Sequence, residues 1–185
     1  MAIIEGARQR ILSKSLGSPA LGTTTAVKAA VTDNGAEQVI TTGITNPPTP
    51  RNVTATAGGT AGDIKAIQVI VAGTNAEGAA ISETLPAFTV DTAGTVTGSK
   101  AFATVTSITI PAHDGTSATT AVGLGAKLGL GERLSLDTVV AAHLNGTREA
   151  TRPTVAVSSS ALESNTITLN SALAGTAVVV DYYTA

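Results

Sequence analysis

The sequence predicts an all-β protein: an antiparallel β-sandwich or barrel-like domain of hairpins, with an N-terminal arm or short helix. First, short apolar runs with period-two alternation are separated by turns rich in Gly, Asn and Asp. Second, about ten such runs follow one another at the short spacing that is typical of sandwiches and barrels. Third, only 2% of the residues are aromatic, so Val, Ile, Leu and Ala must form the core, which suits thin β layers.

The length of 185 residues fits one domain, or one domain with a small appendage. We divide the chain into an N-terminal arm (1–22), a main β domain (23–150) and C-terminal β-strands that pack on the main domain (151–185). The chain has no cysteine, which excludes a disulfide framework and thiolate chemistry.

The N-terminal segment, Met1 to Leu16, has apolar residues at helical spacing, and Gly17 and Pro19 would end such a helix. Two interpretations stay open: a short amphipathic helix on its own domain, or an extended arm that orders only on a partner. In the second case, apolar and basic side chains together form the predicted partner-binding site: Ile3, Ile4, Arg8, Arg10, Ile11, Leu12 and Lys14. Deleting Met1 to Ala20 would then leave the thermal midpoint nearly unchanged and weaken attachment. If attachment persisted, the loops around Asn75 and His113 would be the next candidates.

The segment that follows the arm predicts a first hairpin, with strands at 26–31 and 37–41 around Asn34-Gly35, a strong hairpin signal. Three prolines at Pro47, Pro48 and Pro50 exclude a central strand, so this stretch is a stiff connector or an edge. A strand resumes at Arg51 to Ala57.

The central stretch, Ile64 to Leu130, predicts two more hairpins. Its first pair of strands, 64–72 and 79–88, flanks the turn at 73–78, and its second pair, 101–110 and 118–124, flanks His113-Asp114-Gly115. Glu83 interrupts an apolar row, so it lies at a strand edge or faces a neighbouring subunit.

The C-terminal part begins with Leu134 to Leu144, which the pattern leaves open between a strand and a short helix. Asn145-Gly146 forms a turn. Three further strands are expected at 154–157, 166–169 and 177–183.

The search for chemistry finds no motif. The two histidines, His113 and His143, lack the spacing of a metal site. The glycine-rich stretch 123–129 is neither a dinucleotide nor a phosphate loop, so we interpret its glycines as bulges or close backbone approaches. No nucleophile elbow is present. We therefore expect no catalytic residue, no metal and no cofactor, and no enzyme.

The charge content favours a protein partner. Charged residues are only 13% of the chain, and a surface so poor in charge is often covered by another protein. A net charge of −2 gives no reason to expect nucleic acid. We expect no membrane partner, because no run is long enough to span a bilayer and no secretory signal is visible.

Several segments carry a resemblance to a known group of proteins: Val69 to Thr84, Lys100 to Ile108, Val122 to Leu130, and Thr166 to Tyr183, which looks like a closing hairpin. They resemble virion structural proteins of tailed bacteriophages, and the chain is most similar to a capsid decoration (cement) protein. The resemblance implies binding to the outside of the shell at capsomer junctions, where the protein would stabilise the capsid.

The implied partners are the major capsid protein or other virion proteins, together with copies of the chain itself in a homo-oligomer, for example a trimer. The protein would be made in the host cytoplasm and end in the virion. A tail, neck or head-fibre component is the closest alternative. A carbohydrate-binding β-sandwich is another, although four aromatic residues provide little material for the platforms that hold sugars.

Overall fold

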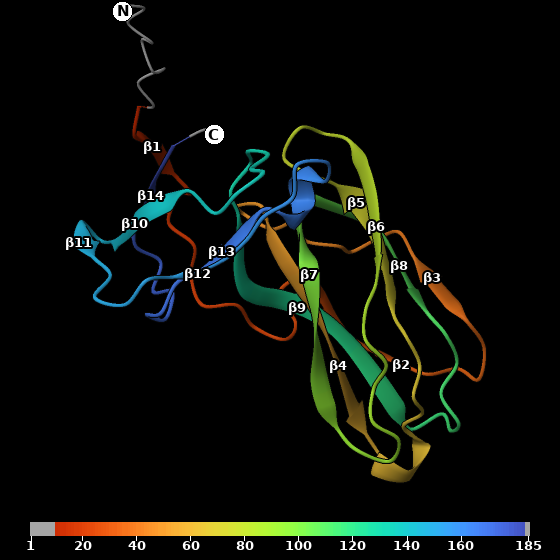
Figure 1. The fold of residues 1–185 in the computed structure, drawn as a ribbon. Helices are drawn as coiled ribbons and strands as arrows, with labels where there is room; N and C mark the ends of the chain where they lie inside the picture. The colour runs from red at the N-terminus through yellow and green to blue at the C-terminus, as the bar shows by residue number, and fades with distance from the viewer. Residues whose placement is uncertain (1–9, 184–185) are drawn as a thin grey trace, which may run out of the picture.

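The computed structural model describes residues 10–183, and nearly all of its regular structure is β (Figure 1). This confirms the predicted all-β fold. The strands are β1 Leu12–Ser15, β2 Lys28–Thr32, β3 Gln38–Ile40, β4 Arg51–Gly59, β5 Ile70–Thr74, β6 Ala80–Thr84, β7 Gly94–Phe102, β8 Thr104–Ile110, β9 Ala118–Gly129, β10 Val139–Leu144, β11 Thr147–Arg148, β12 Thr154–Ala156, β13 Thr166–Thr168 and β14 Val178–Tyr182. Two single turns of 3-10 helix complete the set: η1 Ala61–Asp63 and η2 Leu162–Ser164.

The strands form three antiparallel sheets. The first has the order β12-β13-β9-β4-β7, and β2 also pairs with β9. The second has the order β3-β8-β5-β6, and the third β1-β14-β10-β11. In Figure 1 the first two sheets form the larger body, while the third lies at its upper left end.

The larger hydrophobic core lies between the first two sheets. Its members are almost wholly aliphatic, and Phe102 and Phe88 are its two aromatic side chains. Fully burying one Val, Leu, Ile or Phe side chain contributes about 1.5–3 kcal/mol. The stability of this core therefore comes from many small contributions of aliphatic side chains, as the low aromatic content predicted.

A second core lies under the third sheet. It joins Leu16 from the N-terminal segment to Leu128 and Leu130 at the end of β9, and to Ile167 and Val180 from the C-terminal strands. Strand β9 thus contributes to both cores. The two cores divide the chain differently from the predicted segments 1–22, 23–150 and 151–185, because the second core takes residues from both ends.

A bulge in β9 marks the passage between the cores. Val53 pairs with Leu124 and Arg51 with Leu128, so three residues of β9 lie opposite one residue of β4. The guanidinium of Arg51 is buried and donates to the carbonyl oxygens of Gly125 and Ala20. Burial lowers the pKa of Arg51 from its ordinary value. Side chains of β4 thus bind backbone groups that the bulge removes from the ladder.

Two of the predicted turns connect paired strands in the structure. Strands β5 and β6 pair around the turn that begins at Asn75, whose Oδ1 accepts from the amides of Glu77 and Ala79. Strands β10 and β11 pair around Asn145-Gly146, where both residues have positive φ (52° and 76°). That backbone favours Asn and Gly. In the segment that the sequence left open between strand and helix, residues Val139–Leu144 form strand β10, and no helix is present there.

Other predicted hairpins are wrong. Strands β2 and β3 flank Asn34-Gly35 but do not pair: β2 joins β9, and β3 joins β8. The turn instead carries the chain from one sheet to the other, while the buried Asp33 accepts from the amide of Gly35. The hairpin predicted around 113–115 is wrong for the same reason, since β8 and β9 lie in different sheets. The closing hairpin is also wrong, since β13 and β14 lie in different sheets.

Two strand predictions were right in place but wrong in extent. The predicted strand 101–110 is divided at Ala103, because β7 ends at Phe102 and β8 begins at Thr104. The amide of Ala103 donates to Thr74 instead. In the preceding hairpin β5 covers 70–74 where 64–72 was predicted, and β6 covers 80–84 where 79–88 was predicted.

Candidate docking surface

The predicted partner-binding residues differ in whether the structure describes them and in how exposed they are. Ile3, Ile4 and Arg8 lie outside the described residues. Arg10 is exposed, and the side chains of Ile11 and Leu12 are 63% and 40% exposed.

Lys14 belongs to an internal ion pair instead. Its Nζ lies 2.9 Å from Oε1 of Glu132 and donates to the carbonyl of Gly131 at 3.0 Å. Its charge is thus satisfied within the chain, so Lys14 is a weak candidate for contact with a partner.

The local structure of this segment corrects the helical interpretation. Leu12–Ser15 form β1, which pairs with β14 from Leu12–Tyr182 to Ser15–Val179. The ladder is extended by Leu16, whose amide donates to Val178, and Leu16 is buried in the second core. The segment from Leu12 onward is therefore part of the third sheet, and deleting Met1 to Ala20 would remove one of its strands.

Four exposed apolar residues belong to the two segments that flank the end of β14, at the start of β1 and at the start of β10. The register places Leu12, Tyr182 and Val139 in one row, so β1 and β10 begin where β14 ends (Figure 1). We call this the apolar end and define it by the following residues: Ile11, Leu12, Leu136 and Val140. Leu136 is 64% exposed and Val140 43%. Half of the eight exposed large hydrophobic residues of 10–183 belong to it, and such clustering marks an interaction surface.

Sequence order explains why the apolar end was only half predicted. Ile11 and Leu12 could be predicted, because they stand next to basic residues in the same short segment. Val140 is exposed because the register of β10 and β14 shifts between Val139 and Ala141, and this bulge takes it out of the ladder. No sequence signal marks that shift.

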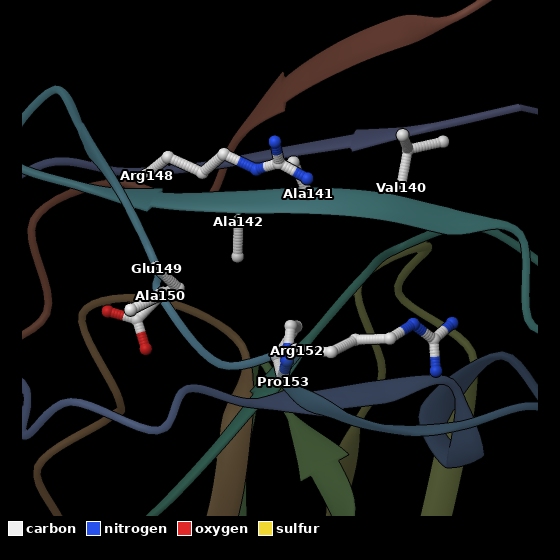
Figure 2. Close-up of a pocket in the computed structure, with 8 residues that line it drawn as sticks. All are labelled: Val140, Ala141, Ala142, Arg148, Glu149, Ala150, Arg152 and Pro153. Atoms are coloured by element: carbon white, nitrogen blue, oxygen red, sulfur yellow. The ribbon is translucent and has the colours of Figure 1, made fainter.

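A hollow of about 510 Å³ adjoins the apolar end and shares Val140 with it. Figure 2 shows its walls: β10 with Ala141 and Ala142 on one side, and the segment that holds Glu149, Ala150 and Pro153 on the other. It lies beside β10 because β11 is only two residues long, so the chain leaves the ladder at once. A smaller hollow of about 330 Å³ continues it along Leu144 and Ser171.

The charged groups of this hollow are mostly bound within the chain. Arg152 lies 2.7 Å from Asp137 and donates to the carbonyl of Val139. Burial acts to raise the pKa of Glu149, but hydrogen bonds from Ser171 and the backbone of Asn170 outweigh it, so this pKa lies below its ordinary value. Arg148 is exposed and forms no ion pair within residues 10–183. It is the cation that a partner entering the hollow would meet.

The outer face of the third sheet brings together a serine, an aspartate and a histidine that sequence reasoning did not connect. Ser13 donates to Asp181 at 2.5 Å, and Nδ1 of His143 lies 3.7 Å from Asp181. A catalytic triad needs the histidine between the nucleophile and the acid. Here the aspartate is in the middle, so this row does not activate Ser13 through a base.

The remaining site predictions concern aromatic residues, metals and loops. All four aromatic residues are described, and Phe88, Phe102 and Tyr182 are buried, which leaves Tyr183 as the single partly exposed ring. That is thin support for a sugar-binding platform. In the described part of the chain no group of three His, Cys, Asp or Glu side chains could hold a metal ion.

The loops around Asn75 and His113 are not open surfaces at those positions, because both side chains are buried. Asn75 is bound in its own turn, as described above, and lies 3.5 Å from Glu163. The glycine-rich stretch 123–129 agrees with its structural interpretation: a Cβ on Gly123 would lie 2.1 Å from the carbonyl oxygen of Thr23. Across residues 10–183, no helix is long and apolar enough to cross a membrane.

Comparison of the chain with family models, with curated proteins and with solved structures gives no match.

Proposed function

We propose that this is a non-enzymatic structural protein of a tailed-bacteriophage virion, which binds the outer surface of the capsid and stabilises it. The observation that carries the proposal is the apolar end, where four large side chains are exposed: two at the start of the edge strand β1 and two at the start of β10. A protein whose surface is otherwise rich in Thr, Ser and Ala gains most of its binding free energy from such a cluster.

The open edge of β1 adds backbone hydrogen bonds to this surface. Strand β1 is the outermost strand of its sheet, and its neighbour on one side is β14. An edge strand offers unpaired amides and carbonyls to an extended segment of a partner. The lysine that could discourage such pairing, Lys14, is bound to Glu132. The same edge suits a shell subunit or a second copy of this chain, which is how we account for the expected homo-oligomer.

The test is co-sedimentation of the purified protein with empty heads of the particle to which it belongs. We expect the unmodified protein to sediment with heads, and the double variant Leu136→Ser/Val140→Ser to bind at least about 100-fold more weakly, since each buried aliphatic side chain contributes about 1.5–3 kcal/mol. The matched control is Val39→Ser/Val90→Ser, which changes two residues that are 61% and 52% exposed and lie elsewhere.

Equal binding of both double variants would refute the apolar end as the docking surface. An unmodified protein that ignores heads but binds tails would favour the tail or neck alternative. A protein that binds neither would overturn the proposal.

A further inference from the structure

The buried histidine His113 joins strand β9 to the segment that precedes β5. Its Nδ1 lies 3.1 Å from the amide nitrogen of Lys65, on the segment that leads into β5. Its Nε2 lies 3.0 Å from Oγ1 of Thr120 on β9. The ring is stacked with Phe88 at a centroid distance of 6.1 Å. This one ring therefore connects the segment 61–65 with β9 of the first sheet.

The hydrogen bonds determine the protonation state of the ring. An amide N–H is a donor only, so Nδ1 must accept from Lys65 and carry no proton. Nε2 then carries the proton and donates to the hydroxyl of Thr120. A second proton on Nδ1 would place a donor against a donor, which breaks the contact with Lys65. The arrangement therefore exists only with neutral His113.

Charged groups face the ring from each segment packed around it. Asp33 comes from the β2–β3 connection and accepts from the amide of His113 at 3.4 Å. Asp114 follows His113 in its own loop, and its carboxylate lies 2.9 Å from Nζ of Lys65. Asp63, in η1, accepts from the amide of Ser117.

The two other side chains in contact with the ring, Phe88 and Thr120, are uncharged.

We propose that His113 is a pH-operated latch: the neutral ring closes the loop 111–117 onto the segment 61–65, and protonation opens it. A cationic ring loses Lys65 and gains an alternative, because Asp33 and Asp114 are the nearby carboxylates to which it can turn. The latch therefore has two arrangements with different partners, as a switch requires.

The direction of the pH effect follows from burial. Burial lowers the pKa of His113, and the charges of Asp33 and Asp114 oppose this shift without cancelling it. Between the folded and the ordinary pKa, the unfolded chain binds more protons than the folded chain, so folding stability rises with pH. The stabilisation is complete above the ordinary value of 6.5 and is lost as the pH falls below it toward the folded value. The latch thus closes at neutral pH and opens in acid.

The test uses the whole unmodified protein and two nuclear magnetic resonance measurements. In a titration of the imidazole signals, we expect His113 to titrate at lower pH than histidine in an unstructured peptide. In hydrogen exchange at a series of pH values, we expect the protection factor of the Lys65 amide to fall at least about tenfold as His113 is protonated. The amide of Leu85, which donates to Val69, is the internal control and should keep its protection factor.

The variant His113→Asn retains an acceptor near Nδ1 but does not titrate, so its Lys65 protection should not depend on pH in this range. The matched variant His143→Asn, in the third sheet, should keep the dependence. If the Lys65 amide of the unmodified protein stays equally protected when His113 is protonated, or if His113 titrates at or above the ordinary value, the latch does not exist. These two measurements decide the question even if His113→Asn fails to fold.

Discussion

Asn52 and Lys127 are joined by a hydrogen bond of 2.9 Å, from the backbone amide of Lys127 to Oδ1 of Asn52. On its other side, Nδ2 of Asn52 donates to the carbonyl of Gly98 at 2.9 Å. Both contacts fall where the ladders of β4 shift register, toward β9 and toward β7. One fully buried side chain therefore holds bulges in both neighbours of the central strand. Asn52-Val53-Thr54 also fits the acceptor triplet for N-glycosylation, and all three residues are buried in the folded chain.

Replacing Asn52 by alanine should be among the most destabilising single changes to a polar residue. The variant leaves the amide of Lys127 and the carbonyl of Gly98 without their partner, and each buried unpaired group costs about 1–3 kcal/mol. We expect the free energy of unfolding in urea to fall by about 2–5 kcal/mol. Asn34→Ala, at an exposed turn, is the control and should change it by less than about 1 kcal/mol. Similar urea midpoints for the two variants would contradict this role.

Asn165 should behave similarly in the second core. It is buried, its Oδ1 accepts from the amides of Leu134 and Ser158, and its Nδ2 donates to the carbonyls of Ser158 and Ala161. For Asn165→Ala we expect a loss of about 2–4 kcal/mol, or roughly 4–16 °C in the thermal midpoint. Asn170→Ala, five positions later and exposed, should leave the midpoint within about 2 °C. A loss of less than about 1 kcal/mol would show that water replaces these bonds.

Gly123 should not tolerate a side chain. A Cβ there would lie 2.1 Å from the carbonyl oxygen of Thr23, a backbone atom that cannot move freely because the amide of Leu124 donates to it. We expect Gly123→Ala to destabilise the protein by about 1–3 kcal/mol in urea unfolding. Gly94→Ala, in β7, meets no atom within 4 Å and should be neutral or slightly stabilising. An equal effect of the two substitutions would show that this close approach does not matter.

Two truncations separate the arm from the third sheet. Removing residues 1–10 leaves β1 complete, so the thermal midpoint should stay within about 2 °C. Removing residues 1–16 takes away the ladder with β14 and the buried Leu16, whose loss alone costs about 2–5 kcal/mol. We expect the second truncation to lower the midpoint in differential scanning calorimetry by about 4–20 °C. Equal midpoints would show that β1 is only loosely attached.

Much of the fold could be predicted because its signals are local. The all-β class follows from alternation and turn chemistry, and the hairpin at Asn145-Gly146 forms because two consecutive residues accept positive φ. Partner choice between sheets is not local. The turn at Asn34-Gly35 has the same chemistry, yet β2 pairs with β9 about 90 residues away in sequence, because the two-layer core needs a strand in each sheet.

The residues of the candidate site also differ in whether a local sequence signal predicts them. Ile11 and Leu12 could be found from the sequence, since they lie in one short apolar and basic segment. Leu136 and Val140 could not, because the start of β10 is brought toward the start of β1 only by the pairing of both strands with β14. The ion pair of Lys14 could not be predicted for the same reason, as its partner Glu132 is 118 positions away.

The pairing of Leu12 with Tyr182 has a mechanical consequence. Because β1 begins where β14 ends, a force that pulls the two chain ends apart acts across the β1–β14 ladder and not along it. The hydrogen bonds then open one after another, like a zip, instead of bearing the load together in shear. Pulled from its ends, the molecule should yield first at this pair and at low force, while the ladder between β4 and β9 is still intact.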